Sequence, residues 1–234
     1  DLGVIPAIEL ARIPGLVALG GMGVAAQDGE GAAAEVRSIL LLCRGPVAEV
    51  KTVALDRASR TSAALAQILL RQKFGARCAA VEGDRHWRQS LARADATLLI
   101  GDPALRLRVS GEAAAEGLAA YDLARVWREW TGLPFVFAVW GIRAPVWAAE
   151  RGWLGERLSA ALEEGLMNRE KLVTLWAQRL ALAPAEVRRY LQENVAYRIT
   201  AAHREGLRRF FALAAEEKLI PAADMPPLVE VPGA

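Results

Sequence analysis

Cysteine and histidine are both scarce in this chain, and their scarcity excludes two kinds of site. The 234 residues include two cysteines and two histidines. Cys43 and Cys78 form no C-x-x-C pair and no cluster with His86 or His203. We therefore expect reduced, buried, structural thiols, and neither disulfides nor a zinc site.

The chain also lacks an excess of either charge and any long hydrophobic run. Its 29 lysines and arginines nearly balance 27 aspartates and glutamates, for a net charge of +2. That balance gives no electrostatic footprint for nucleic acid or a membrane surface, and the apolar runs are too short for a membrane span. G-x-G-x-x-G, a P-loop, G-x-S-x-G and H-E-x-x-H are absent as well. We expect a function without nucleotide, metal or acyl-enzyme serine.

Apolar residues, in contrast, are abundant, since 53% of the chain is hydrophobic and 24% is charged. A chain of this length can bury a core as one large or two small domains. Up to Trp140, short β-rich runs alternate with helical patterns, which favours an α/β fold with a parallel sheet. The predicted strands are Leu2–Ile5, Val17–Leu19, Val36–Cys43, Val53–Leu55, Cys78–Val81, Ala96–Ile100 and Phe135–Trp140; the predicted helices between them are Ser59–Lys73, Trp87–Ala94 and Tyr121–Trp130.

After Pro145 the pattern is helical throughout, with an apolar stripe on each helix. Pro184 predicts the first turn of one of these helices, and Thr200 followed by His203 predicts the start of another. The tail 221–234 contains four prolines and is expected to be extended and loosely held.

Two β segments, Val36–Cys43 and Leu133–Trp140, are the most apolar and enclose the middle of the chain. We interpret them as crossing strands, along which the chain leaves one α/β lobe and later returns to it. This interpretation predicts a bilobed protein, with lobe one formed by residues 1–40 and 136–234 and lobe two by residues 41–135. In such folds we expect a ligand at the carboxyl ends of strands and between the lobes.

The most informative motif is V-A-L-D-R-A-S-R-T-S-A-A, residues 53–64. It indicates a strand that breaks into a helix, and the first turn of that helix carries Ser59, Arg60, Thr61 and Ser62. A helix N-terminus offers backbone N–H groups and the positive end of the macrodipole, to which these side chains add donors. The combination predicts a binding site for a carboxylate or phosphate. The alternative is an ordinary N-cap at Asp56 or Ser59 followed by a solvated turn.

Two further strand ends complete the predicted site. Pro6 follows the first strand, and Gly101 and Asp102 follow the strand Ala96–Ile100. Gly101 lets the backbone approach a ligand. Asp102 can accept a hydrogen bond from a substrate hydroxyl, with a turn or N-cap aspartate as the alternative. Neither histidine has a carboxylate or thiol neighbour at catalytic spacing, so we expect neither to be a general base.

Six segments, in order along the chain, carry a family resemblance. They are D-L-G-V-I-P-A-I-E-L, V-R-S-I-L-L-L, V-A-L-D-R-A-S-R-T-S, A-T-L-L-I-G-D-P-A-L, Y-D-L-A-R-V-W-R-E-W-T-G-L-P-F-V-F-A-V-W and R-R-Y-L-Q-E-N-V-A-Y-R-I. Together they resemble the chorismate dehydratase family, which acts in the futalosine route to menaquinone, over nearly the whole chain. The resemblance implies a periplasmic-binding-protein-like type 2 fold and a cytoplasmic enzyme.

The resemblance further implies a cofactor-free lyase that removes water from chorismate, a dicarboxylate, to give 3-[(1-carboxyvinyl)oxy]benzoate. Two carboxylates must be neutralised, which suits the turn Ser59–Ser62. A proton must also leave the ring carbon that bears the enolpyruvyl ether. Asp102 and the substrate's own enolpyruvyl carboxylate are both candidate bases. Because the ring becomes aromatic, positioning is expected to supply much of the catalysis.

The chain departs from the family at its start. The family's N-terminal segment, with a tyrosine–leucine–asparagine motif before the first helix, is not in this chain, which begins at Asp1. We therefore expect part of the fold and of the site to precede Asp1. Ala7 stands where a small hydroxyl residue is expected.

Three alternatives to the dehydratase remain. Dihydroxynaphthoate synthase of the same pathway shares the fold, but its reaction resembles one that needs a histidine base in the cleft. A solute-binding protein for a small carboxylate also shares the fold, which does not fix function. The segments D-R-A-S-R-T-S and P-F-V-F-A-V-W favour the dehydratase over that protein. A ligand-sensing domain has no DNA-binding segment to support it.

Overall fold

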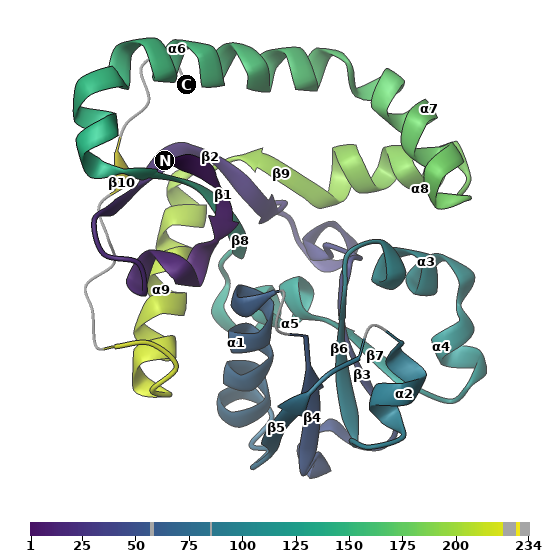
Figure 1. The fold of residues 1–234 in the computed structure, drawn as a ribbon. Coiled ribbons are helices and arrows are strands. Elements are labelled where there is room, and N and C mark those ends of the chain that lie inside the picture. The colour runs from purple at the N-terminus through teal and green to yellow at the C-terminus, as the bar shows by residue number, and fades with distance from the viewer. Residues whose placement is uncertain (57–58, 85, 222–227, 230–234) are drawn as a thin grey trace. The chain divides into compact units, whose positions relative to one another are not determined.

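The structure, a computed structural model, describes residues 1–56, 59–84, 86–221 and 228–229, and the chain forms two compact units (Figure 1). Unit 1 comprises Asp1–Asp28 and Leu133–Ala234, and unit 2 comprises Gly29–Gly132. The chain therefore passes between the units twice, as the predicted bilobed fold requires. No helix among the described residues is long and apolar enough to cross a membrane.

Unit 2 is built on a five-stranded sheet in the order β5-β4-β6-β3-β7. Its strands are β3 (Ile39–Cys43), β4 (Thr52–Leu55), β5 (Ala79–Glu82), β6 (Ala96–Ile100) and β7 (Ala119–Asp122). Its helices are α1 (Arg60–Ile68), α2 (Trp87–Leu91), α3 (Asp102–Ser110), α4 (Glu112–Ala115) and α5 (Leu123–Thr131), with short helical turns η2 (Gly31–Ala34), η3 (Val47–Glu49) and η4 (Leu69–Lys73).

Strand β3 is the core of unit 2, because every one of its residues is buried. Leu40 and Leu42 point to the face on which α2, α3 and α4 pack, where they join Leu99 and Leu107. The alternate residue Leu41 points to the opposite face, on the side of α1 and α5 (Figure 1). A strand covered on both faces explains the unbroken apolar run in the sequence.

Unit 1 is built on a second five-stranded sheet. Four of its strands pair in the order β1-β8-β2-β10, and the fifth, β9, pairs with β2. Its strands are β1 (Leu2–Pro6), β2 (Leu16–Ala26), β8 (Val136–Arg143), β9 (Val195–Arg198) and β10 (Leu228–Val229). Its helices are α6 (Ala144–Met167), α7 (Arg169–Leu180), α8 (Pro184–Arg189) and α9 (Ala201–Glu216), with the turns η1 (Ala7–Ala11) and η5 (Tyr190–Asn194).

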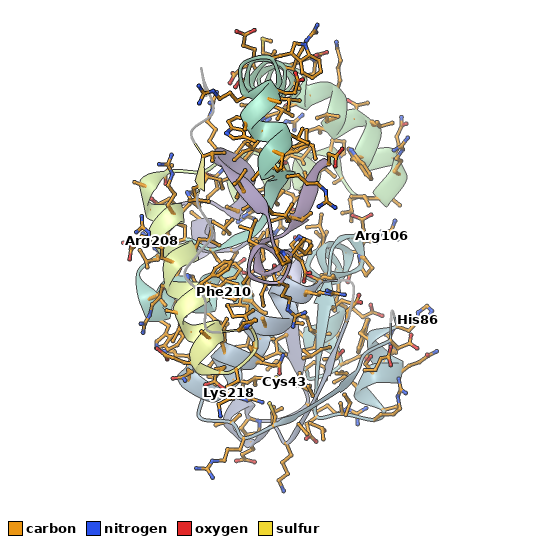
Figure 2. The ribbon with its side chains drawn as sticks, turned by 60° about the vertical axis from the view of Figure 1, so that its left-hand side comes forward. Cys43, His86, Arg106, Arg208, Phe210 and Lys218 are labelled. Atoms are coloured by element: carbon orange, nitrogen blue, oxygen red, sulfur yellow. The ribbon has the colours of Figure 1, made fainter. Side chains whose placement is uncertain are left out.

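Helix α9 packs closely on the strand segment that opens β8. Phe210 is fully buried and meets Phe135 edge to face, with 5.1 Å between ring centroids. Gly206 allows this approach, since a Cβ there would lie 2.1 Å from the carbonyl oxygen of Pro134. Figure 2 shows Phe210 turned towards the strands and Arg208 turned away from them.

Most predicted elements are present with shifted ends. The predicted helix Ser59–Lys73 is α1 continued by the π-helical turn η4, and it stops at Gly75, whose φ is +70°. Pro184 opens α8, and Thr200 caps α9, both as predicted. Most of the proline-rich tail lies outside the described residues; within it, Leu228–Val229 forms β10.

Four expectations about the elements and the units need correction. The sheet of unit 2 is mixed rather than parallel, because β3 runs antiparallel to both β6 and β7. Neither predicted crossing strand runs between the units, because Val36–Cys43 lies wholly in unit 2 and Leu133–Trp140 wholly in unit 1. Tyr121 and Asp122, predicted to be helical, are the last two residues of β7, and α5 begins at Leu123. The units divide at 28/29 and 132/133 instead of at 40/41 and 135/136.

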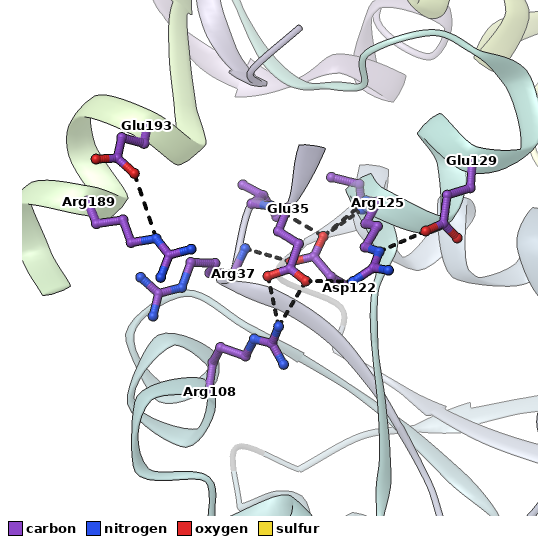
Figure 3. A network of polar contacts seen from close by, with 10 residues as sticks. Glu35, Arg37, Arg108, Asp122, Arg125, Glu129, Arg189 and Glu193 are labelled. Atoms are coloured by element: carbon purple, nitrogen blue, oxygen red, sulfur yellow. Dashed lines mark hydrogen bonds and ion pairs between the residues drawn. The ribbon is translucent and has the colours of Figure 1, made fainter. Parts of the chain in front are cut away.

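A buried acid network fixes the segment that leads into β3 (Figure 3). The Asp122 carboxylate accepts backbone N–H bonds from Val36 (3.2 Å) and Arg37 (2.6 Å), and from Ala124 (3.1 Å) in the first turn of α5. Glu35, buried beside it, binds Arg108 with both oxygens, at 2.9 and 2.8 Å. Arg125 joins Glu35 at 3.2 Å. The network thereby ties residues 35–37 to α3 and α5.

Burial raises the pKa of Asp122 from 3.8 to about 6, against the N–H donors that lower it. Between pH 3.8 and about pH 6, Asp122 is therefore protonated in the folded state and ionised in the unfolded state. Stability should therefore fall as pH rises through this window, by about 3 kcal/mol from this group alone.

The Asp122→Asn variant should lack this pH-dependent loss. We expect urea unfolding between about pH 4 and pH 7 to show a stability difference, wild type minus variant, that decreases as pH rises. Asp95→Asn is the control, since hydrogen bonds from Thr52 and Lys51 lower the pKa of Asp95. For that variant the same stability difference should increase as pH rises. A wild type and Asp122→Asn variant with parallel pH profiles would contradict the prediction.

Candidate functional site

The polar groups of the predicted site gather at one edge of the sheet of unit 2, which we call the carboxyl edge. Strands β5 and β6 both run parallel to β4, and β7 has the same direction because both it and β6 are antiparallel to β3. Their carboxyl ends therefore share this edge. Helices α1 and α3 follow the neighbouring strands β4 and β6, so both helix N-termini lie there, as open α/β sheets require.

The first turn of α1 divides into exposed and buried members. Arg60 is exposed and Ser59 is half-buried, whereas Thr61 and Ser62 are each 1% exposed. Ser59 occupies the N-cap position without a capping side-chain bond; its hydroxyl instead donates to Ser62 Oγ at 2.8 Å. Ser59 therefore does not cap the helix with its side chain, as an ordinary N-cap would. The turn presents an arginine next to a pair of linked hydroxyls at the positive end of a helix.

The turn between β6 and α3 has the backbone geometry that only glycine adopts readily. Gly101 has φ +69° and ψ −146°, and a Cβ there would meet no atom within 4 Å. Its N–H donates to the carbonyl of Ser38 at 2.7 Å, which joins this turn to the start of β3. Asp102 is the first residue of α3 and is exposed, with Pro103 behind it. Its carboxylate thus lies at the carboxyl edge.

Pro6 belongs to unit 1, whereas the other predicted site residues belong to unit 2. It ends β1 in unit 1 and precedes the turn η1, where it is half-buried. The structure brings together Ser59, Arg60, Thr61, Ser62, Gly101 and Asp102 at the carboxyl edge of unit 2.

The histidines and cysteines lie in other settings. His203 is 2% exposed, with Nε2 donating to the Ala26 carbonyl at 2.8 Å and Nδ1 engaged by Thr200. His86 precedes α2 on an exposed loop (Figure 2). Cys43 and Cys78 are buried free thiols, as predicted. Burial raises the pKa of Cys43 to about 12 and raises that of Cys78 too, so neither is a ready nucleophile.

The sequence reasoning missed the charged residues at the β7 end of the carboxyl edge. Asp122 and Arg37 are buried there, and Arg108 and Arg125 reach the same network from α3 and α5. The segment Y-D-L-A-R held a signal for Asp122, because an aspartate before a helical run is a typical N-cap. The network places three arginines on this edge, and the carboxylates of Glu35, Asp122 and Glu129 offset their charge.

A wide groove of unit 2 lies away from the predicted site residues. It measures about 670 Å³ and lies between α2 and α3, with His86, Trp87, Pro103 and Arg106 among its lining residues. None of the predicted site residues lines it. Within the described part of the chain, no group of three or more histidine, cysteine, aspartate or glutamate side chains is arranged to hold a metal ion.

Comparisons with known proteins agree with this architecture. Residues 1–216 match the family described as menaquinone biosynthesis. A chorismate dehydratase from Thermus thermophilus is 30% identical over 196 residues, which span 75% of this chain and 67% of that protein.

Two solved structures share the fold. Protein AF1704 from Archaeoglobus fulgidus has a TM-score of 0.70 at 18% identity, over 94% of this chain and 80% of that one. The periplasmic aliphatic sulphonate binding protein SsuA from Escherichia coli has a TM-score of 0.62 at 16% identity, over 98% and 77%. These likenesses show the periplasmic-binding-protein-like fold, and the match over residues 1–216 shows that the chain belongs to the menaquinone biosynthesis family.

Proposed function

We propose that this protein is a chorismate dehydratase, a hydro-lyase that acts on chorismate without a cofactor in the cytoplasm. The observation that carries the proposal is the 30% identity to a chorismate dehydratase over 75% of the chain, within a family of menaquinone biosynthesis. The carboxyl edge of unit 2 supports it, because chorismate carries two carboxylates and the edge offers two helix N-termini and Arg60.

The proposed reaction is an elimination that needs positioning and one base. The base takes the proton from the ring carbon that bears the enolpyruvyl ether, and the C–H electrons form the new ring double bond as the bond to the neighbouring hydroxyl breaks. The departing hydroxyl takes up the proton from the base and is released as water. The gain of aromaticity drives the step, so that holding chorismate in one orientation contributes much of the rate. Arg60, Ser59 and the N–H groups of α1 would hold a carboxylate. Asp102 stands at the adjacent helix start, and the substrate's enolpyruvyl carboxylate is the alternative base.

The structure weakens one alternative and leaves another. A dihydroxynaphthoate synthase would need a histidine base in the cleft. Both ring nitrogens of His203 are already engaged by Ala26 and Thr200, and His86 lies on the exposed loop before α2. A solute-binding protein remains the second candidate, since SsuA, whose fold this chain shares, is described as a sulphonate binding protein. Binding with no turnover separates that candidate from the dehydratase.

Incubation with chorismate tests the proposal directly. The protein is mixed with chorismate without added metal or nucleotide, and the products are separated by chromatography. We expect 3-[(1-carboxyvinyl)oxy]benzoate to accumulate in proportion to protein concentration. Saturable chorismate binding without product would instead make the carboxyl edge a recognition site of a solute-binding protein, and neither binding nor product would overturn both readings.

Arg60→Ala should weaken chorismate binding without loss of folding, because Arg60 is exposed and at the first residue of α1. Loss of one charge-assisted contact predicts roughly a 10- to 100-fold rise in the dissociation constant by calorimetry. Arg93→Ala removes the same charge from an exposed position that precedes β6, at the opposite edge of the sheet. Equal affinity in Arg60→Ala and Arg93→Ala would remove Arg60 from the site.

Asp102→Asn distinguishes the two candidate bases. If Asp102 takes the proton, the variant should bind chorismate normally and lose turnover by roughly 10²- to 10⁴-fold. Asp95→Asn, the same chemical change before β6, should keep full turnover. Retained turnover in Asp102→Asn would assign the proton transfer to the substrate's own carboxylate.

A further inference from the structure

Unit 1 contains a small cavity that the proposed reaction does not use. It measures about 180 Å³ and lies where α6, α7, η5 and β9 meet. Its walls are apolar, formed in part by Leu162 and Leu166 of α6 and Leu172 of α7. The volume is below the roughly 300 Å³ at which pockets for drug-sized ligands begin, so an occupant must be small.

One charged group interrupts these apolar walls. Arg169, the first residue of α7, lines the cavity, and its Nε is buried without a hydrogen-bond partner among the described residues. A buried guanidinium N–H that binds nothing costs free energy, and an anion in the cavity would satisfy it. The start of α7 adds the positive end of its helix dipole at the same place.

Neighbouring acids do not neutralise Arg169. Glu170, the next residue, binds Arg188 with both oxygens, at 2.9 and 2.7 Å. Glu163 of α6 pairs with Arg198 of β9. The acids that flank the cavity are thus occupied by other arginines, which leaves the charge of Arg169 for a ligand.

Tyr197 supplies a second polar group. It comes from β9 and lines the same cavity as Arg169. Burial, with Tyr190 nearby, raises the pKa of Tyr197 to about 12, although Arg169 lowers it. Its hydroxyl therefore stays protonated and able to donate. Tyr197 and Leu191, which also lines the cavity, belong to the segment R-R-Y-L-Q-E-N-V-A-Y-R-I, for which the carboxyl edge gives no role.

We propose that this cavity binds a small monocarboxylate with an apolar body, its carboxylate on Arg169 and its hydrocarbon part among the leucines of α6 and α7. A guanidinium holds a carboxylate through paired N–H donors, and the apolar walls favour a hydrocarbon over water. This site lies within unit 1 and does not rest on the proposed dehydratase activity.

Calorimetry with hexanoate and hexanamide, which differ in charge and hardly in size, tests the proposal. We expect saturable binding of hexanoate and binding of hexanamide at least about 10-fold weaker. Arg169→Met should weaken hexanoate by roughly 10- to 100-fold. Lys171→Met, which removes a nearby exposed charge from α7, should leave it unchanged.

A cavity-filling pair keeps the test decisive if Arg169→Met fails to fold. Gly165 lines the cavity, and a Cβ there meets no atom within 4 Å, so Gly165→Leu should fold and abolish hexanoate binding. Gly152→Leu, at an equally open position of α6 that does not line the cavity, should bind like wild type. No saturable binding at millimolar hexanoate, equal binding of hexanamide, or binding that survives in Gly165→Leu would each overturn the proposal.

Discussion

The common direction of β4, β5, β6 and β7 is the constraint on which the arrangement of unit 2 depends. Parallel neighbours need a crossover connection, and helices that follow parallel strands begin at the same edge. The starts of α1 and α3 are thus adjacent because β4 and β6 are adjacent and parallel. Antiparallel β3 brings the incoming chain to the same edge, where the Ser38 carbonyl accepts the Gly101 N–H. Helix dipoles, hydroxyls and arginines therefore lie at one edge because of the strand directions alone.

The same arrangement explains why the pKa of Asp122 is raised. An aspartate at the end of β7 is needed to cap α5 and to hold the backbone of residues 36 and 37. The same burial that makes the carboxylate a good clamp raises its pKa. Arg108 and Arg125 pair with Glu35 in the same network, so its acids and arginines offset one another. The network therefore fixes the backbone at this edge and adds little net charge to it.

Features that depend on residues close together in the sequence were predicted, whereas features that depend on contacts between distant residues were not. Strands β4 and β6 and the helix after residue 59 were found because apolar runs and helical spacing are local signals. Strand β7 was missed because three of its four residues are not buried and lack an apolar pattern. Strand β2 runs well beyond the predicted Val17–Leu19. Its extension includes Gly23, where a Cβ would lie 2.7 Å from the Ala138 carbonyl, and glycine there reflects contact with β8 rather than strand propensity.

The candidate site shows the same division. The motif at residues 59–62 identified a helix start with donors, but it did not distinguish exposed Arg60 from buried Thr61 and Ser62, because burial depends on packing by distant elements. Pro6 was predicted to face the site because it follows the first strand, and that strand belongs to unit 1. The cavity at Arg169 had no sequence signal, since a half-buried arginine at a helix start reads as an ordinary surface charge.

The connections between the units are held at both ends. In unit 1, the Ala26 N–H donates to the Phe135 carbonyl and the Ala26 carbonyl accepts from His203, so the outgoing and returning chain are joined there. In unit 2, Asp122 joins the segment before β3 to the start of α5, whose last turn ends at Gly132 with φ +73°. Between these ties lie two short stretches, 28–30 and 132–134, because the turn η2 (Gly31–Ala34) packs on α5. Among the described residues, the two sheets do not share a strand at these crossings, since β3 pairs only with strands of unit 2 and β8 only with strands of unit 1.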